Sequence, residues 1–296
     1  MTPPYFGQNP TNVNAVVGEL GPHILANAQL HWAVLVDTAF DYEGGANLHN
    51  ISDHHNCYAD LEDLRDLAAV APCIFPIDAT EIGSKACTQL LLHASGRPML
   101  SIIASQLPLA QLLHYWQPLH WAYSSDPADA QRFALRFADT RTLATLPTQL
   151  SPEQWQALYG PLAFWFIVNR AGKLELLKKP PADTAAAPSI ALSAKTMGRM
   201  AQASAADSVL TQLASNAEEA FFADQAPWAM YQQVQAALAL GHRHQVQGGA
   251  DTQALAWSAC ASKGAAIQSP RLLELLIGKE YRPGKLAHAI AALKLA

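Results

Sequence analysis

The stretch from Arg132 to Val168 decides the fold and reads RFALRFADTRTLATLPTQLSPEQWQALYGPLAFWFIV. Its first part alternates Phe133, Leu135 and Phe137 with polar or small residues. This period of two predicts a strand with one buried face.

Arg136 and Asp139 lie at the end of that predicted strand, three residues apart and flanked by aromatic residues. Charged groups in a half-buried place are stable only when they pair or bond to the backbone, because an isolated buried charge is strongly destabilising. We therefore expect Arg136 and Asp139 to pair as a structural clasp.

A helix is predicted next, because the Ser-Pro-Glu sequence at residues 151–153 combines a cap, a first-turn proline and an acidic first turn. Gly160 and Pro161 end this helix before an apolar run at residues 162–168. That run predicts a buried strand.

These residues resemble the signature of the type VI secretion adaptor family, the effector chaperones usually encoded between a VgrG spike protein and its toxin. The family has an aromatic strand ending in Arg-Phe-Tyr-Asp-Pro-Arg, then a helix carrying a Gln, then Gly-Pro before an aromatic strand. The corresponding residues here are Arg136-Phe137-Ala138-Asp139-Thr140-Arg141, Gln154, Gly160-Pro161 and Phe164-Trp165. Ala138 and Thr140 depart from the pattern, where the family has Tyr and Pro.

Two earlier segments extend the resemblance, which spans roughly residues 30–175. Trp32 to Asp37 is similar to the family's opening strand ending in Asp, and Ala71-Pro72 is similar to its Ala-Pro before a strand. The resemblance implies a secreted effector toxin and the VgrG spike as partners. It also implies a shared structural motif formed by Asp37, Arg136, Asp139, Arg141, Gly160 and Pro161.

Charge and composition limit the function classes. Residues 1–177 carry 8 Lys and Arg against 16 Asp and Glu, whereas residues 178–296 carry 11 against 8. Neither part is basic enough for a nucleic-acid partner, which needs a strongly positive patch. The first ten residues lack a signal-peptide pattern, and no apolar run approaches the roughly 20 residues that cross a bilayer. We therefore expect a cytoplasmic protein with no membrane partner.

The order of elements predicts an α/β (α+β) fold in two parts. Apolar runs alternate with helical patterns up to residue 177, which favours a mixed sheet with packed helices. Residues 178–189, KKPPADTAAAPS, have no buried pattern and predict a linker. The segments beyond are rich in Ala and Leu at helical spacing, and they predict helices that include Ala194 to Asn216 and Glu218 to Phe222. The predicted domains are therefore 1–177, the linker 178–189 and an all-helical lobe at 190–296.

Apolar patterns predict a buried strand at His31 to Asp37 and three helices of the first part, one of them at Lys85 to His93. Asn9 to Ala28 predicts a helix interrupted at Gly21-Pro22. Tyr58 to Ala69 predicts a helix whose inward-facing residues are Leu61, Leu64, Leu67 and Ala68.

One polar loop contains metal-ligating residue types: His49, His54, His55 and Cys57. Zinc prefers such ligands, but a structural site uses regular short spacings, and adjacent His54 and His55 do not easily face one ion. We therefore interpret this segment as a solvated loop with no metal or cofactor. A metal-dependent hydrolase using these four residues is the alternative.

Catalytic motifs are missing from the sequence, which has no P-loop, no GxGxxG, no HExxH and no nucleophile elbow. We therefore expect no enzymatic activity. The four cysteines include no CxxC pair, which favours reduced core residues. Most aromatic residues around the opening stretch are expected in the core: Trp116, Trp121, Trp155, Tyr159, Phe164 and Trp165.

The end of the chain is basic. Residues 263–296 hold six Lys and Arg against two acids, beside rows of Leu and Ile with core-facing spacing. A basic face beside an apolar row favours an acidic amphipathic helix as its partner. The candidate partner-binding residues are Arg271, Lys279, Arg282 and Lys285. A merely solvated basic face is the alternative.

The leading hypothesis is a non-enzymatic chaperone and adaptor that holds a type VI secretion toxin and loads it onto the spike. The alternatives are the metal-dependent hydrolase and a structural subunit of another assembly. Because the matched motifs all lie before Lys178, we expect the helical lobe to discriminate between toxins and the first lobe to supply the shared scaffold.

Overall fold

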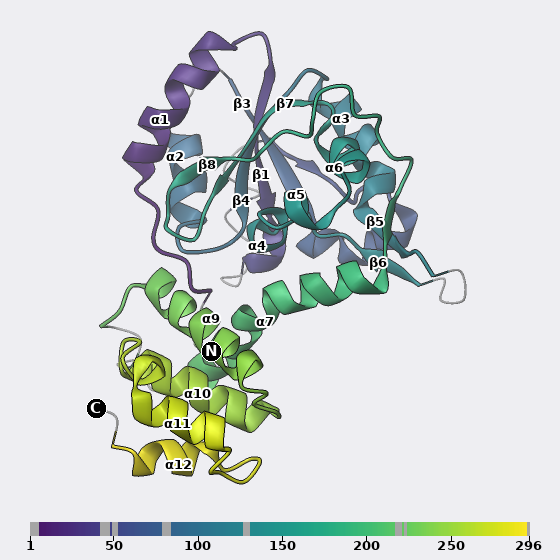
Figure 1. Ribbon diagram of the computed structural model, residues 1–296. Helices are drawn as coiled ribbons and strands as arrows, with labels where there is room; N and C mark the ends of the chain where they lie inside the picture. Colours follow the sequence, from purple (N-terminus) through teal and green to yellow (C-terminus); the bar gives the residue numbers. More distant parts are fainter. Residues whose placement is uncertain are drawn as a thin grey trace. The chain divides into compact units, whose positions relative to one another are not determined.

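The computed structural model describes residues 6–41, 48, 53–78, 84–126, 131–216, 221 and 224–294. Its contacts divide the chain into two units (Figure 1). The first unit is Pro10–Ala203, and the second joins Met1–Asn9 to Ser204–Ala296. Within the described residues, no helix is long and apolar enough to span a membrane.

A six-stranded antiparallel sheet forms the centre of the first unit, with the strand order β2-β3-β1-β4-β7-β8. The central strands β1 and β4 are buried on both faces, which explains their near-continuous apolar sequences. The strands are β1 (His31–Asp37), β2 (His55–Asn56), β3 (Pro72–Ile77), β4 (Leu100–Ser105), β7 (Leu162–Val168) and β8 (Leu174–Leu176).

Helices cover both faces of this sheet (Figure 1). Successive residues of β7 point to opposite faces. On one face, His23 of α1 (Val13–Ala26) contacts Phe164 and Phe166. On the other, Trp165 contacts aromatic rings of α3 (Leu109–Trp116) and α6 (Pro152–Tyr159). The other helical segments of this unit are η1 (Thr38–Phe40), η2 (Glu62–Val70), α2 (Lys85–His93), η3 (Gln117–His120), α4 (Thr140–Leu143) and α5 (Leu146–Gln149).

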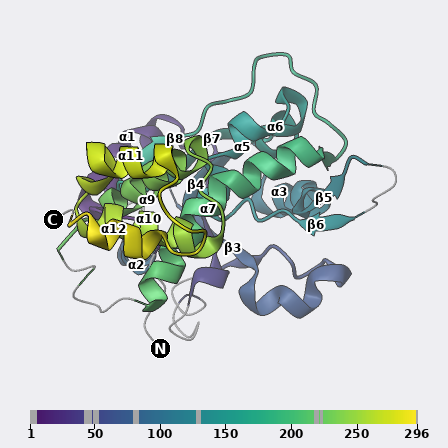
Figure 2. The same cartoon turned by 60° about the horizontal axis from the view of Figure 1, so that its bottom comes forward.

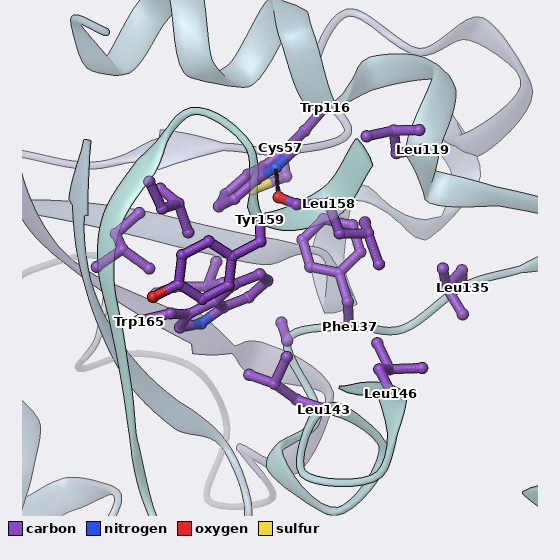
Figure 3. Packing of buried hydrophobic residues seen from close by; sticks show 14 of the residues in the cluster. Cys57, Trp116, Leu119, Leu135, Phe137, Leu143, Leu146, Leu158, Tyr159 and Trp165 are labelled. Atoms are coloured by element: carbon purple, nitrogen blue, oxygen red, sulfur yellow. Dashed lines mark hydrogen bonds between the residues drawn. The ribbon is translucent and has the colours of Figure 1, made fainter. Parts of the chain in front are cut away.

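The core between the sheet and α3 and α6 is aromatic (Figure 3). Trp165 stacks on Trp155 at a ring distance of 5.7 Å and lies 5.6 Å from Trp116. The indole N–H of Trp116 donates to the carbonyl of Leu158 at 3.0 Å, so its polar atom is satisfied inside the core. The expected core role is confirmed for Trp116, Trp155, Tyr159 and Trp165, whereas Trp121 and Phe164 are only partly buried.

A small second sheet includes residues that the sequence assigns to the helical lobe. It has the order β6-β5-β9, formed by β5 (Trp121–Ser124), β6 (Arg132–Ala134) and β9 (Ile190–Leu192). β9 pairs in parallel with β5, and its Ile190 and Leu192 are buried. Residues 190–296 are therefore not wholly helical.

The segment 178–189 has no helix or strand, but its backbone bonds to α6. The Trp155 indole N–H donates to the Lys178 carbonyl at 2.9 Å, and the Ala187 N–H donates to the Glu153 carbonyl at 2.9 Å. The unit boundary of the structure falls later, between Ala203 and Ser204. The division into 1–177, 178–189 and 190–296 stays a prediction.

The second unit packs helices around its own apolar core. Its helical segments are the end of α7 (Ala194–Asn216), α9 (Pro227–Arg243), α10 (Gly249–Ala261), η4 (Ala266–Gln268), α11 (Pro270–Gly278) and α12 (Leu286–Ala292) (Figure 2). The predicted core-facing residues are confirmed at Leu272, Leu275 and Leu276 of α11 and at Leu286 and Ile290 of α12. The α+β fold class is confirmed, and among the described residues the parallel strand pair lies in the small sheet.

Three secondary-structure predictions are wrong. α1 runs through Pro22 without interruption. The predicted helix at Tyr58–Ala69 is instead the 3-10 segment η2, in which Leu64 is buried and Leu67 is 45% exposed. The predicted strand through Phe137 ends at Ala134, because the Phe137 N–H turns back to the Leu135 carbonyl. The helix predicted at 218–222 falls mostly outside the described residues.

Candidate functional site at the end of the central strand

Asp37 ends β1 and is fully buried. One carboxylate oxygen accepts the Ala39 N–H at 3.2 Å and caps η1, and the other accepts from Nη2 of Arg136 at 2.7 Å. Burial raises the pKa of Asp37, while the charge and hydrogen bond of Arg136 act in the opposite direction. The carboxylate therefore depends on Arg136 for its charge compensation.

The predicted pairing of Arg136 with Asp139 is wrong, because Asp139 pairs with Arg141. Two guanidinium nitrogens of Arg141 donate to the two oxygens of Asp139 at 3.1 and 2.8 Å. Asp139 also caps α4 by accepting the Arg141 N–H at 2.9 Å. The turn at Phe137 leaves Asp139 buried beside Arg141 and directs Arg136 to Asp37 at the end of β1.

Phe40 joins the two ion pairs. The guanidinium carbons of Arg136 and Arg141 lie 5.2 and 4.8 Å from the centre of its buried ring. Arginine packs favourably against aromatic faces, and the effect grows as water is excluded. The ring therefore helps to hold both guanidinium groups in place.

A third buried carboxylate, Asp41, lies against the end of α2. His93 Nε2 and Arg97 Nη1 are 3.2 and 3.6 Å from its Oδ1. Among the described residues, neither Asp41 oxygen has a well-aligned hydrogen bond, so these contacts are mainly electrostatic. Sequence reasoning missed Phe40, Asp41, His93 and Arg97. The available signal was the His-Arg pair spaced by four residues at a helix end.

We call these residues the arginine cluster: Asp37, Phe40, Asp41, His93, Arg97, Arg136, Asp139 and Arg141. The three carboxylates lie below the surface, with side chains 0, 4 and 8% exposed for Asp37, Asp41 and Asp139. The guanidinium side chains are more accessible, at 42% for Arg136, 24% for Arg141 and 18% for Arg97. The cluster therefore presents cations outward and keeps anions inside.

Backbone bonds fix the chain segments around the cluster. The Asp37 N–H donates to the Met99 carbonyl at 2.8 Å, and the Thr38 hydroxyl donates to the Ala71 carbonyl at 2.7 Å. The Thr140 N–H donates to the Pro98 carbonyl at 3.0 Å. Proline, which the adaptor signature has at this position, lacks that donor.

Gly160, Pro161 and Gln154 hold α6 to neighbouring strands. A Cβ on Gly160 would lie 2.7 Å from the Gln156 carbonyl oxygen, so a larger residue does not fit. The Pro161 carbonyl accepts the Gln106 N–H at 3.0 Å just after β4. The Gln154 side chain caps α6 reciprocally with Ser151 and donates to the Ala191 carbonyl at 2.6 Å.

His120 is buried between the ring of Phe137, stacked at 4.9 Å, and the edge of Tyr58 at 5.1 Å. In the described part of the chain, neither ring nitrogen has a hydrogen-bond partner. Burial lowers the pKa of His120 to about 4, and burial is the main cause that raises the pKa of Tyr58 to about 12. Both side chains are therefore neutral at physiological pH.

The proposed metal ligands have separate surroundings. His49 lies outside the described residues, His54 stacks on Phe75 at 5.4 Å, and His55 is exposed on β2. Cys57 is buried, and burial raises its pKa well above the ordinary value. Where the structure describes the chain, no three His, Cys, Asp or Glu side chains are grouped as a metal site requires.

The predicted partner-binding residues Arg271, Lys279, Arg282 and Lys285 are all exposed. Three of them lie in the connection between α11 and α12, whereas Arg271 lies at the other end of α11. The connection is anchored by the buried Asp251, which accepts the N–H groups of Gly284 and Leu286 at 2.8 and 2.9 Å. The structure therefore separates Arg271 from the other three.

Comparison with known proteins gives one match. No curated protein and no solved structure matches the chain. The family described as Domain of unknown function (DUF4123) matches residues 32–157. The matched segment contains all of β1 except its first residue, together with the arginine cluster and Gln154, and ends before Gly160-Pro161. Residues 32–157 of this chain are therefore similar to the DUF4123 family.

Proposed function

We propose that this protein is a non-enzymatic chaperone and adaptor that binds a type VI secretion toxin and loads it onto the VgrG spike. The observation that carries the proposal is the DUF4123 match over residues 32–157, which includes most of the adaptor signature. The ion pairs of Asp37 with Arg136 and of Asp139 with Arg141 support it, because they involve four signature residues in the matched segment.

We further propose a division of labour between the two units. The match lies entirely in the first unit, so contacts shared across the family, including the contact with the spike, belong there. The helical unit lies outside the match and exposes Lys279, Arg282 and Lys285 on an anchored connection. This unit would select the toxin, through an acidic amphipathic helix that meets the basic residues.

Co-expression of this chain with a VgrG spike protein and a secreted toxin from the same organism tests the proposal. We expect the three chains to co-elute in size-exclusion chromatography and the toxin to precipitate when this protein is omitted. Failure of either partner to bind the purified full chain would contradict the adaptor function and favour a subunit of another assembly.

A zinc measurement separates the adaptor from the hydrolase alternative. An adaptor retains both partners after His54→Ala and after treatment with a chelator. Stoichiometric zinc that is lost together with a hydrolytic activity in His54→Ala would contradict the non-enzymatic function.

A further inference from the structure

Arg136 is held in place but has unused hydrogen-bond donors. Only its Nη2 contacts Asp37, and its Nε and Nη1 have no polar partner among the described residues. Its side chain is 42% exposed, so these donors are accessible from outside. A guanidinium has five N–H donors in a planar fork, which matches a carboxylate in a two-point contact.

Its support differs from that of an ordinary surface arginine. Arg132, four residues earlier, has a side chain about as exposed as that of Arg136 and pairs with Asp63 at the same distance of 2.7 Å. Its guanidinium also lies over an aromatic ring, that of Trp121. Its partner Asp63, however, is 56% exposed, whereas the Asp37 side chain is completely buried. Asp37 therefore holds Arg136 from below without presenting a negative charge to an approaching ligand.

A buried carboxylate is a costly way to stabilise a fold, since a well-packed apolar pair often does as well or better. At this site the buried carboxylates Asp37 and Asp139 each orient one arginine, and the ring of Phe40 lies against both arginines. Pre-oriented donors bind more tightly because less side-chain freedom is lost on binding. The arrangement therefore suits recognition of an anion.

The surrounding charge selects the kind of anion. Residues 1–177 carry 16 Asp and Glu against 8 Lys and Arg, so an extended polyanion such as nucleic acid would be repelled by the rest of this part. A single carboxylate needs only the local donors. We propose that Arg136, assisted by Arg141, binds a side-chain carboxylate of a partner protein, a role that rests on the adaptor function.

Titration of the full chain with the peptide acetyl-Ala-Glu-Glu-Ala-amide, followed by the NMR signals of arginine Nε–H groups, tests the inference. We expect the Arg136 and Arg141 signals to shift in a saturable manner, while the Arg132 signal stays in place. Arg136→Lys keeps the charge but removes the planar fork, and should weaken peptide binding about tenfold. The matched control Arg132→Lys should change it by less than about twofold.

The control peptide acetyl-Ala-Gln-Gln-Ala-amide lacks the carboxylates. Three outcomes would overturn the inference: no saturable shift at Arg136, equal shifts at Arg132 and Arg136, or binding of the control peptide as tight as that of the Glu-Glu peptide. A second titration uses inorganic phosphate in place of the peptide, at the same ionic strength. If phosphate binds as tightly as the peptide, and Arg136→Lys weakens that binding, the site would be assigned to phosphate groups instead. Co-elution of spike and toxin is a separate measurement. A negative result at Arg136 would therefore overturn the carboxylate site without contradicting the adaptor function.

Discussion

Among the single residues of the cluster, Arg136, which follows β6, compensates the charge of the buried Asp37 at the end of β1. Removing one partner of a buried pair leaves an uncompensated charge. Arg136→Ala should therefore lower the free energy of unfolding by about 3 kcal/mol, measured by urea denaturation. Arg132→Ala, whose partner Asp63 is exposed, should cost less than about 1 kcal/mol.

The double variant Arg136→Ala with Asp37→Asn provides the control. It removes the buried Asp37 charge as well as the Arg136 guanidinium that compensates it, so the double variant should be more stable than Arg136→Ala alone. Equal stability of the single and double variants would show that the loss comes from arginine packing and not from the ion pair.

We expect His120 to make the free energy of unfolding depend on pH in the acidic range. Its pKa is about 4 in the folded chain and 6.5 when exposed, so the unfolded chain binds the extra proton between these values and stability falls as pH decreases. From pH 7 to pH 5 this residue should remove about 2 kcal/mol of stability. His120→Phe keeps an aromatic ring between Tyr58 and Phe137 and should abolish that part of the pH dependence.

Urea denaturation of both chains at pH 7 and pH 5 measures this difference. Acid effects from other groups, including the raised pKa of Asp37, are common to both chains and cancel in the comparison. An unchanged pH dependence in His120→Phe would show that His120 does not control acid stability.

At the scale of elements, β9 decides where the first unit ends. Ile190 and Leu192 are buried in the first unit, and Gln154 bonds to the backbone between them. A chain of residues 10–203 should therefore unfold cooperatively, whereas one ending at Leu177 exposes the β5 edge and part of the aromatic core. We expect the shorter chain to melt well below the longer one in calorimetry. Equal melting temperatures would place the end of the folded unit at Leu177.

Local patterns explain which elements were predictable. β1, α2 and α7 have the predicted bounds, because an uninterrupted apolar run or a capped helical period specifies each of them. β9 has only three residues after a Pro- and Ala-rich segment, and its pairing with β5 depends on a distant part of the chain. The 3-10 form of η2 was also not predictable from the sequence, because the spacing of its Leu residues fits an α-helix.

The candidate site was only half predictable for a related reason. The sequence identified Asp37, Arg136, Asp139 and Arg141 through their resemblance to a family signature, but it paired Arg136 with the nearer carboxylate. Sequence distance favoured Asp139, whereas the tight turn at Phe137 brings Arg136 to Asp37 at the end of β1. Phe40, His93 and Arg97 entered the cluster through tertiary packing, which no local pattern records.

At the scale of the whole molecule, the chain combines a family-matched unit with a helical unit that lies outside the match. This composition fits a carrier whose shared contacts and variable contacts reside in different parts. We propose that the toxin reaches the spike through this protein. The most direct measurement is the amount of toxin recovered with tagged spike protein, with and without co-expression of this chain.

We expect toxin recovery with the spike to require the full chain and to fall to background when the chain is omitted. A chain of residues 10–203 should still bind the spike but should not restore toxin recovery. Toxin that binds the spike equally well without this protein would contradict the adaptor function.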